Sequence, residues 1–144
     1  MKNARALASI VLVFAAALPL LAGDADDAAI MEVVDRAYVQ GIHIDGDAAK
    51  VRSGMHDSFV MLVRTDTGVN QVTRDQWISR LKPRDASAPR PDVKANIEVL
   101  DRSGDAAVAK VQLFRDGKQI FTDYISLYRF TDGWKLVGKT FQKM

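Results

Sequence analysis

The second half of the chain consists of strand-forming segments separated by glycine-containing turns. Apolar and polar residues alternate from Val93 to Val99 and again from Ala107 to Leu113. A period of two residues is typical of a β-strand with one buried side and one solvent-facing side. Hairpin turns are expected at Ser103-Gly104, Asp116-Gly117 and Asp132-Gly133. This half of the sequence therefore predicts a four-stranded antiparallel meander.

The first half has the period of a helix instead. Asp26 or Asp27 is placed to cap a helix that Gly46 ends. The apolar positions of this helix recur at i, i+3 and i+4, and they are Ile30, Val33, Val34, Ala37, Tyr38, Gly41 and Ile42. Asp47 caps a second, shorter helix. Two helices in succession are therefore expected.

A strand and a third helix join the two halves. Residues 59–63 (FVMLV) form a continuous apolar run, which is typical of a strand buried on both faces. Thr73 and Gln76 have the spacing of a capping box, and Pro83 ends the helix that follows. The order of elements predicts a single α+β domain, a curved antiparallel sheet whose concave face is closed by the N-terminal helices.

The N-terminus has the layout of a secretory signal peptide. Lys2 and Arg5 precede an apolar run over residues 6–21, and Ala22 is a small residue suited to cleavage. We therefore expect a signal peptide at residues 1–22 and a mature domain at residues 23–144, located in the periplasm or secreted. An uncleaved membrane anchor is the alternative.

The composition excludes several kinds of partner and site. The chain has 20 Lys and Arg against 18 Asp and Glu, and the loss of Lys2 and Arg5 makes the two signs equal. A balanced charge gives no support to a nucleic-acid partner or to binding at an anionic membrane surface. There is no cysteine for thiol catalysis, and the two histidines, His43 and His56, lack the spacing of a metal site. No metal and no cofactor are expected.

Several short motifs, taken in order, resemble a known superfamily. They are Tyr38 with Gly41, His56-Asp57, Thr73-Arg74, the run from Gly104 to Ala107, Thr122-Asp123-Tyr124 with Leu127, and the run from Trp134 to Val137 with Lys139 and Phe141. Together they resemble the nuclear transport factor 2-like (SnoaL-like) superfamily and, within it, the group called putative lumazine-binding proteins. The resemblance implies a cone with an apolar pocket between helices and sheet, and a homodimer formed through the outer sheet face. Relatives such as ketosteroid isomerase and scytalone dehydratase use acids, histidines and tyrosines of this pocket as general acids and bases.

Asp123 lies in a predicted strand among apolar neighbours, and the preceding turn decides which side of the sheet it faces. A two-residue Asp116-Gly117 loop pairs Asp123 with Lys110, and both side chains then face solvent. A three-residue loop that includes Arg115 pairs Asp123 with Ala109 and turns the carboxylate to the apolar face. The second register keeps the apolar residues of the strand inside, so it is the preferred interpretation.

Lys139 presents the same choice across the last turn. A two-residue Asp132-Gly133 loop sends Trp134 and Leu136 inward and leaves Lys139 outside. A loop that includes Thr131 reverses this facing and brings Lys139 near the carboxylate. Burial of a tryptophan is more favourable than burial of a lysine, so Lys139 is expected on the outer face.

The expected pocket has a polar contact point and an apolar wall. Asp123 and Tyr38 are its polar contacts, and both are candidate catalytic residues. The wall consists of Tyr38, Ile42, Phe59, Met61, Trp77, Leu81, Phe121, Ile125 and Trp134. His56, before the first strand, is expected at the mouth of the cone, either as a catalytic partner or as a helix C-terminal cap. His43 lies off the apolar stripe and is expected in solvent.

Three functions are open on this basis. The first is an exported domain that binds a small apolar or aromatic ligand. The second is a proton-transfer isomerase or dehydratase with Asp123 as base and Tyr38 or His56 as partner, which requires two titratable groups within hydrogen-bond distance in the pocket. The third is a dimeric interaction module with Tyr124 and Tyr128 in the interface and a cavity filled by side chains.

Overall fold

The computed structural model describes residues 18–144, so most of the predicted signal peptide, residues 1–17, lies outside the described part. The elements are α1 (Leu18–Val34), the π-helix η1 (Asp35–Ile44), α2 (Ala48–Gly54), β1 (Met55–Arg64), β2 (Val69–Thr73), α3 (Arg74–Ile78), β3 (Val93–Ser103), β4 (Ala106–Arg115), β5 (Lys118–Phe130) and β6 (Gly133–Lys143). Within the described residues, none of the helices combines the length and apolar character needed to cross a membrane.

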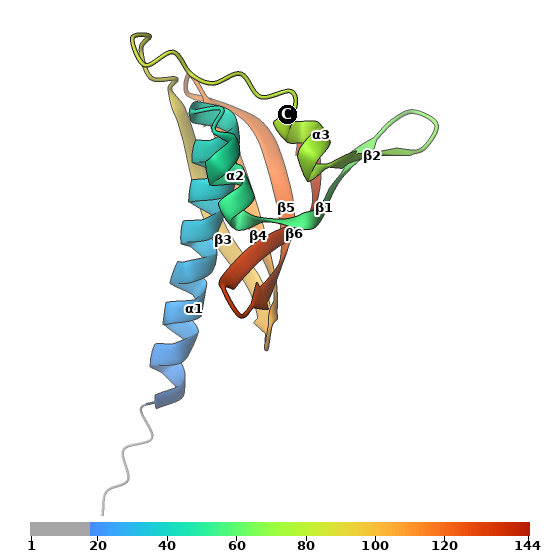
Figure 1. Cartoon of the computed structure of the whole chain (residues 1–144). Helices are drawn as coiled ribbons and strands as arrows, with labels where there is room; N and C mark the ends of the chain where they lie inside the picture. The colour runs from blue at the N-terminus through green and yellow to red at the C-terminus, as the bar shows by residue number, and fades with distance from the viewer. Residues whose placement is uncertain (1–17) are drawn as a thin grey trace, which may run out of the picture.

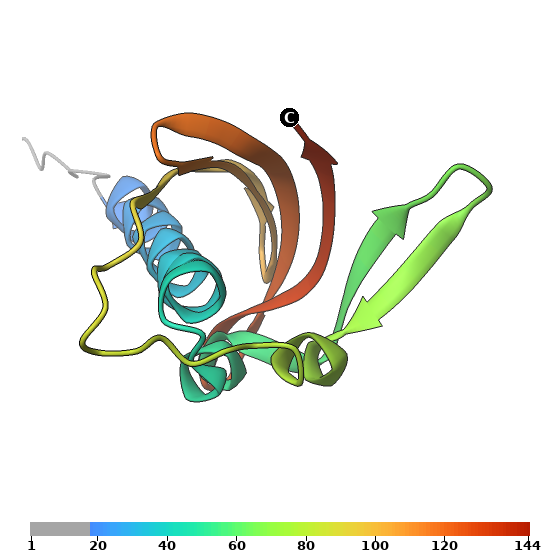
Figure 2. The same cartoon turned by 90° about the horizontal axis from the view of Figure 1, so that it is seen from above.

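The six strands form one curved sheet in the order β2-β1-β6-β5-β4-β3. Neighbouring strands are antiparallel except β1 and β6, which are parallel. The sheet curls around the rod formed by α1 and η1, and the β1–β2 hairpin bends away from it (Figures 1 and 2). The predicted α+β cone with its four-stranded meander is therefore confirmed, and β2 is a strand that the sequence analysis missed.

The helices end and begin largely where local signals predict. Gly46 has a φ of +59°, a left-handed backbone that suits glycine, and it follows the end of η1. Asp47 caps α2 by accepting hydrogen bonds from two backbone N–H groups of the first turn. The start of the first helix is different, because Asp26 and Asp27 lie inside α1. The prediction that one of them caps this helix is wrong.

Of the predictions for β1 and for the helix α3, one is confirmed and one is wrong. Thr73 and Gln76 form the predicted capping box at the start of α3. In β1, Phe59 is fully buried whereas Leu62 is 38% exposed. The prediction of a strand buried on both faces is therefore wrong, because the helices cover only the concave side of the sheet (Figure 2).

One hydrophobic core fills the space between the helical rod and the concave face. Its buried members from α1 and η1 are Ile30, Val33, Val34, Tyr38, Val39 and Ile44, and those from the sheet include Met55, Phe59, Val111, Leu113, Ile125, Leu127, Trp134 and Leu136. Removal of this apolar surface from water, at roughly 25 cal/mol per Å², is the main force that holds the rod inside the sheet.

An extra residue in β5 decides the facing of Asp123. The β4–β5 turn is the two-residue loop Asp116-Gly117, and both residues have a positive φ. Ile120 is skipped between two successive pairs of the β4–β5 ladder, which makes it a β-bulge. Beyond the bulge, Val111 lies opposite Asp123, and Asp123 is fully buried. The predicted facing is confirmed, but the predicted three-residue loop and the partner Ala109 are wrong.

A second extra residue, in β6, turns Lys139 inward. The β5–β6 turn is formed by Thr131 and Asp132, and Val137 is skipped in the ladder farther along. Trp134 and Leu136 are buried before this bulge, and Lys139 is buried after it. The prediction of an outward Lys139 is wrong because a bulge in mid-strand lets the tryptophan and the lysine face the same side.

Candidate functional site

Tyr38, Asp123 and Lys139 form a buried polar cluster inside the cone. The Tyr38 hydroxyl donates a hydrogen bond to Asp123 Oδ2 at 2.8 Å, and Lys139 Nζ donates one to the Tyr38 hydroxyl oxygen at 2.9 Å. Lys139 Nζ also donates to Asp123 Oδ1, which closes the triangle. Tyr38 and Asp123 are 0% exposed and Lys139 is 6% exposed. The helix η1 and the strands β5 and β6 each contribute one member.

Four aromatic rings surround the Lys139 ammonium. The distances from Nζ to the ring centroids are 4.5 Å for Phe141, 4.8 Å for Tyr38, 5.6 Å for Trp77 and 5.7 Å for Phe121. The negative faces of such rings attract a cation. Trp77, Phe121 and Phe141 are only half-buried. The cluster therefore approaches solvent on the side that these three rings form.

Burial controls the protonation of the cluster. Burial lowers the pKa of Lys139, and the charge and hydrogen bond of Asp123 oppose that decrease. Burial also raises the pKa of Tyr38 well above its usual range, and the negative charge of Asp123 adds to the effect. Tyr38 is therefore a neutral hydroxyl at physiological pH, able to donate to the carboxylate. The lysine remains coupled to Asp123 as an ion pair.

His43 is a member of this environment, contrary to the prediction that it lies in solvent. In a π-helix, residues five apart lie on the same side, so His43 follows Tyr38 into the interior. The two rings meet edge to face with their centroids 4.8 Å apart. Burial first, then the charges of Lys139 and Arg115, lower the pKa of His43 to about 3. Its Nε2 atom is buried and has no hydrogen-bond partner among the described residues.

The residues expected to line a pocket all lie on the inner side, but they pack against one another. Tyr38, Phe59, Ile125 and Trp134 belong to the buried core, and the half-buried Ile42, Met61, Trp77, Leu81 and Phe121 pack against it. The space of the expected apolar pocket is thus largely occupied by these side chains. Whether they contact a ligand stays a prediction.

His56 is the candidate catalytic residue that the fold does not bring to the cluster. It stacks on Phe130 with ring centroids 4.6 Å apart, and its Nδ1 accepts a hydrogen bond from the Ser58 N–H at 3.2 Å. It lines a surface hollow of about 340 Å³ together with Arg74 and Lys135. Of the three candidates, only Asp123 and Tyr38 are brought together.

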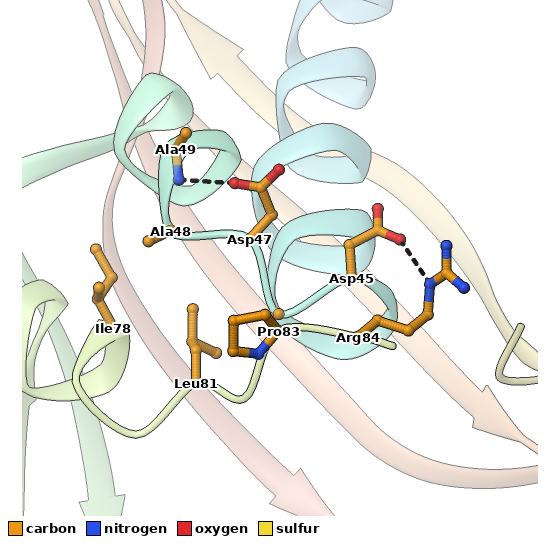
Figure 3. Close-up of a pocket in the computed structure, with 9 residues that line it drawn as sticks. Asp45, Asp47, Ala48, Ala49, Ile78, Leu81, Pro83 and Arg84 are labelled. Carbon is orange, nitrogen blue, oxygen red and sulfur yellow. Dashed lines mark hydrogen bonds and ion pairs between the residues drawn. The ribbon is translucent and has the colours of Figure 1, made fainter. Parts of the chain in front are cut away.

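A larger hollow, of about 450 Å³, lies where the segment after α3 crosses the start of α2 (Figure 3). Asp45, one of its charged residues, forms ion pairs with Lys50 at 2.7 Å, Arg84 at 3.5 Å and Arg90 at 3.8 Å. The hydrogen bond from Lys50 is the main cause that lowers the pKa of Asp45. Leu81 contributes to the wall. These contacts attach the irregular segment before β3 to the helices.

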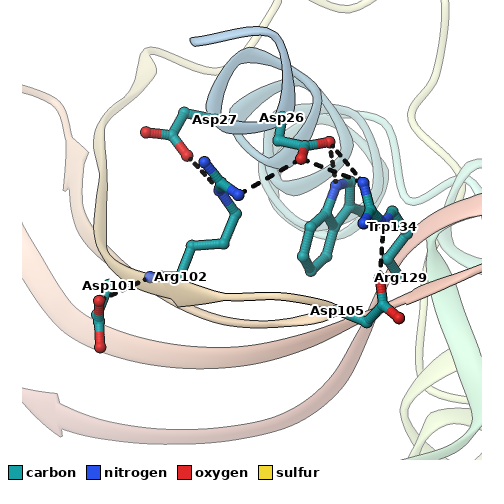
Figure 4. Close-up of polar contacts among 7 residues, drawn as sticks. All are labelled: Asp26, Asp27, Asp101, Arg102, Asp105, Arg129 and Trp134. Atoms are coloured by element: carbon teal, nitrogen blue, oxygen red, sulfur yellow. Dashed lines mark hydrogen bonds and ion pairs between the residues drawn. The ribbon is translucent and has the colours of Figure 1, made fainter. Parts of the chain in front are cut away.

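A second charged network attaches α1 to the sheet (Figure 4). Asp26 accepts hydrogen bonds from Arg129 Nη1 at 3.1 Å, from Arg102 Nη1 at 3.4 Å and from Trp134 Nε1 at 3.4 Å. Arg129 also donates to Asp105 at 2.8 Å. Asp26 therefore joins the helix to β3, β5 and β6, a role that replaces the predicted capping role.

The curved sheet and the helical rod that it encloses define a nuclear transport factor 2-like fold. Solved structures of that class match the chain. An NTF-2 like protein of unknown function from Silicibacter pomeroyi has 17% identity and a TM-score of 0.61, over 81% of this chain and 94% of that one. An NTF2-like protein of unknown function from Shewanella baltica has 23% identity and a TM-score of 0.61, over 81% and 92%. At such identities the likeness shows the fold alone.

The chain belongs to the family described as "Putative lumazine-binding", whose sequence pattern matches residues 25–142. A CaMKII hub from S. rosetta is also similar in structure, with 15% identity and a TM-score of 0.57 over 82% of this chain and 96% of that one. No curated protein sequence matches the chain.

Proposed function

We propose that the protein binds a small, planar, largely aromatic molecule on the concave face, against His43 and Lys139. The observation that carries this proposal is the buried His43 Nε2 atom, which has no hydrogen-bond partner among the described residues. A buried polar atom in that condition costs about 1–3 kcal/mol. Such an atom in a native protein calls for an explanation, and a ligand that bonds to it supplies one.

His43 and Lys139 lie beside the same two aromatic rings. The Tyr38 ring centroid is 4.8 Å from the His43 ring centroid and 4.8 Å from Lys139 Nζ. The Phe121 ring centroid is 6.4 Å from the first and 5.7 Å from the second. A ligand placed here meets aromatic surface, one neutral imidazole nitrogen and one ammonium. These groups favour a flat apolar molecule that carries a carbonyl or a similar acceptor.

The site is closed by side chains that are able to move. Met61, Trp77, Phe121 and Phe141 are half-buried around it. Changes of side-chain rotamer without backbone movement are common when a ligand enters a preformed fold. We therefore place the entrance among these residues, at the side of the cluster nearest to solvent.

The family description names a ligand of suitable chemistry. Lumazine is a flat, bicyclic aromatic molecule with two carbonyl groups, which fits both the aromatic rings and the two nitrogens. It is therefore the first probe for this chain. Titration of lumazine into the purified protein, followed by calorimetry, is expected to show saturable binding.

Variants locate that binding. Lys139→Met is expected to abolish it, and His43→Phe to weaken it. Lys143→Met, which changes an exposed lysine at the end of the same strand, is the matched control and should bind like the parent. Equal binding by all four proteins contradicts the site. A folded parent that binds no lumazine, and that carries no co-purifying mass from its own host in native mass spectrometry, contradicts the function.

Proton transfer is the second candidate function. One observation favours it: Tyr38 and Asp123 are two titratable groups within 2.8 Å of each other, as a general acid and base require. Both are fully buried and bonded to Lys139, so a substrate would have to displace that lysine. The third candidate is an interaction module. An interior filled by side chains favours it, but such a module has no need of a buried ion pair.

We also propose that the protein is exported and forms a homodimer. The basic and apolar composition of residues 1–22 supports export. Tyr124 and Tyr128 are 44% and 53% exposed on the outer sheet face. Tyr124 also lines a hollow of about 420 Å³ together with Leu62, a further exposed apolar residue. Large apolar side chains grouped on one face support a contact with a second copy.

A further inference from the structure

We infer that Lys139 binds a carbonyl compound covalently, as a Schiff base. This inference rests on the proposed function, because it identifies the chemical class of ligand for the same site. The geometry that points to it is the position of a primary amine between a hydroxyl at 2.9 Å and a carboxylate, with four aromatic rings around the nitrogen.

Schiff-base formation requires the free amine as nucleophile. An exposed lysine is almost entirely protonated near neutral pH and reacts slowly for that reason. Burial lowers the pKa of Lys139, which increases the fraction of free amine. The ion pair with Asp123 limits this effect without cancelling it, since burial is the larger cause.

The lysine, the carbonyl compound and the Tyr38 hydroxyl account for every atom, proton and charge in the reaction. The nitrogen lone pair forms the C–N bond, and the carbonyl oxygen takes up a proton to give a carbinolamine. That oxygen then leaves as water, and an iminium remains. An ammonium and a carbonyl thus become an iminium and a water molecule, with one positive charge on each side. The Tyr38 hydroxyl, 2.9 Å from Nζ, is within reach to pass the proton from nitrogen to oxygen.

The product occupies a site that already holds a cation. The iminium nitrogen stays where the ammonium was, next to Asp123 as counter-ion and within 4.5–5.7 Å of the four ring centroids. The same ring faces that attract the ammonium attract the iminium. The aromatic side chains also limit access of water, which slows hydrolysis of the adduct.

Pentane-2,4-dione is the probe for this inference. It reacts with a free amine to give an enaminone, with loss of one water and one proton from the ammonium form, and the product absorbs in the near ultraviolet. The full-length and the mature protein are incubated with it near neutral pH, and the modified residue is found by peptide mass mapping. Modification of Lys139 at least tenfold faster than of exposed Lys143 is the expected result.

Three variants distinguish a positioned amine from a merely accessible one. Asp123→Asn removes the counter-ion that favours the ammonium, so the rate should rise and its pH profile should move to lower pH. Tyr38→Phe removes the proton carrier, and the rate should fall at least fivefold while the pH profile keeps its shape. Asp123→Asn combined with Lys139→Met leaves no amine and no unpaired charge, so it gives a folded protein without the adduct even if Lys139→Met alone does not fold.

The outcomes separate this inference from the proposed function. An enaminone at Lys139 that forms faster than at Lys143 and follows the Asp123→Asn shift supports the covalent role. Modification at Lys143 alone, or at equal rates, overturns it. If lumazine still binds in that case, the proposed function stands and only the covalent chemistry falls. If Lys139 reacts and lumazine does not bind, the amine is accessible and reactive, and the proposed ligand must be replaced by a carbonyl compound.

Discussion

Lys139 and Asp123 form a buried ion pair as diagonal neighbours on two adjacent strands. In the β5–β6 ladder, Lys139 lies opposite Ile125 and Asp123 lies opposite Phe141. The ion pair joins them across that offset, and the Tyr38 hydroxyl contacts both. Desolvation of two charges is costly, so a pair like this often contributes little net stability. The pair is therefore weak evidence for stability, and its position on the concave face is what the proposed ligand site relies on.

Removal of one partner of the pair is expected to destabilise the protein strongly. Lys139→Met leaves Asp123 without a cation, and Asp123→Asn leaves Lys139 without a counter-ion. Each should reduce the free energy of unfolding by about 3–5 kcal/mol. Urea unfolding measures both values.

The double variant provides the control for that prediction. Asp123→Asn combined with Lys139→Met removes both charges, and the asparagine still accepts a hydrogen bond from Tyr38. It is expected to lie within about 1–2 kcal/mol of the parent, because no charge is left buried alone. If the double variant loses as much unfolding free energy as the two single variants together, the two side chains do not stabilise each other.

His43 is expected to make the protein sensitive to mild acid. Its pKa is about 3 in the folded state against 6.5 for the unfolded chain. Between these values the unfolded chain binds a proton that the folded state does not, so stability falls as the pH decreases. The slope approaches about 1.4 kcal/mol per pH unit within that window.

A pair of histidine variants tests this assignment. His43→Phe keeps an aromatic ring without a titratable group and should flatten the dependence of unfolding free energy on pH below 6.5. His56→Gln, which changes the histidine outside the cluster, should keep the slope of the parent. If the slope disappears with His56→Gln instead, the acid sensitivity does not originate in the interior.

The outer sheet face is expected to hold the dimer together. Replacement of Tyr124 and Tyr128 by lysine places charges on a face that would be buried between two copies, and the protein should elute as a monomer in size-exclusion chromatography with light scattering. Met31→Lys, a change to an exposed apolar residue of α1, is the control and should leave the dimer intact. A parent protein that is already monomeric rejects the interface.

Export is expected to produce a shorter chain. If residues 1–22 are a signal peptide, protein recovered from the periplasm or medium should begin near Gly23. Intact-mass measurement of that material decides the question. A mass that retains Met1 favours a membrane anchor instead.

Features that depend on neighbouring residues were predictable from the sequence. The cap at Asp47, the capping box of Thr73 and Gln76, and the alternation that defines β3 and β4 depend on residues within one turn or one strand. The class of fold followed from the order of these elements. For the candidate site, the inward facing of Tyr38 and Asp123 was also correctly predicted.

The rest of the candidate site was decided by tertiary structure. The bulges at Ile120 and Val137 determine which residues lie opposite each other, and the π-helix turns His43 into the interior. Each is a change of one residue in register or phase, and no local propensity distinguishes it from the regular alternative. The choice is made by packing across the cone, where the burial of Trp134 and Leu136 and the pairing of Lys139 with Asp123 are satisfied together. The Tyr38 hydroxyl that joins the pair comes from a helix 85 residues before Asp123 and 101 before Lys139, so only the tertiary structure assembles the cluster.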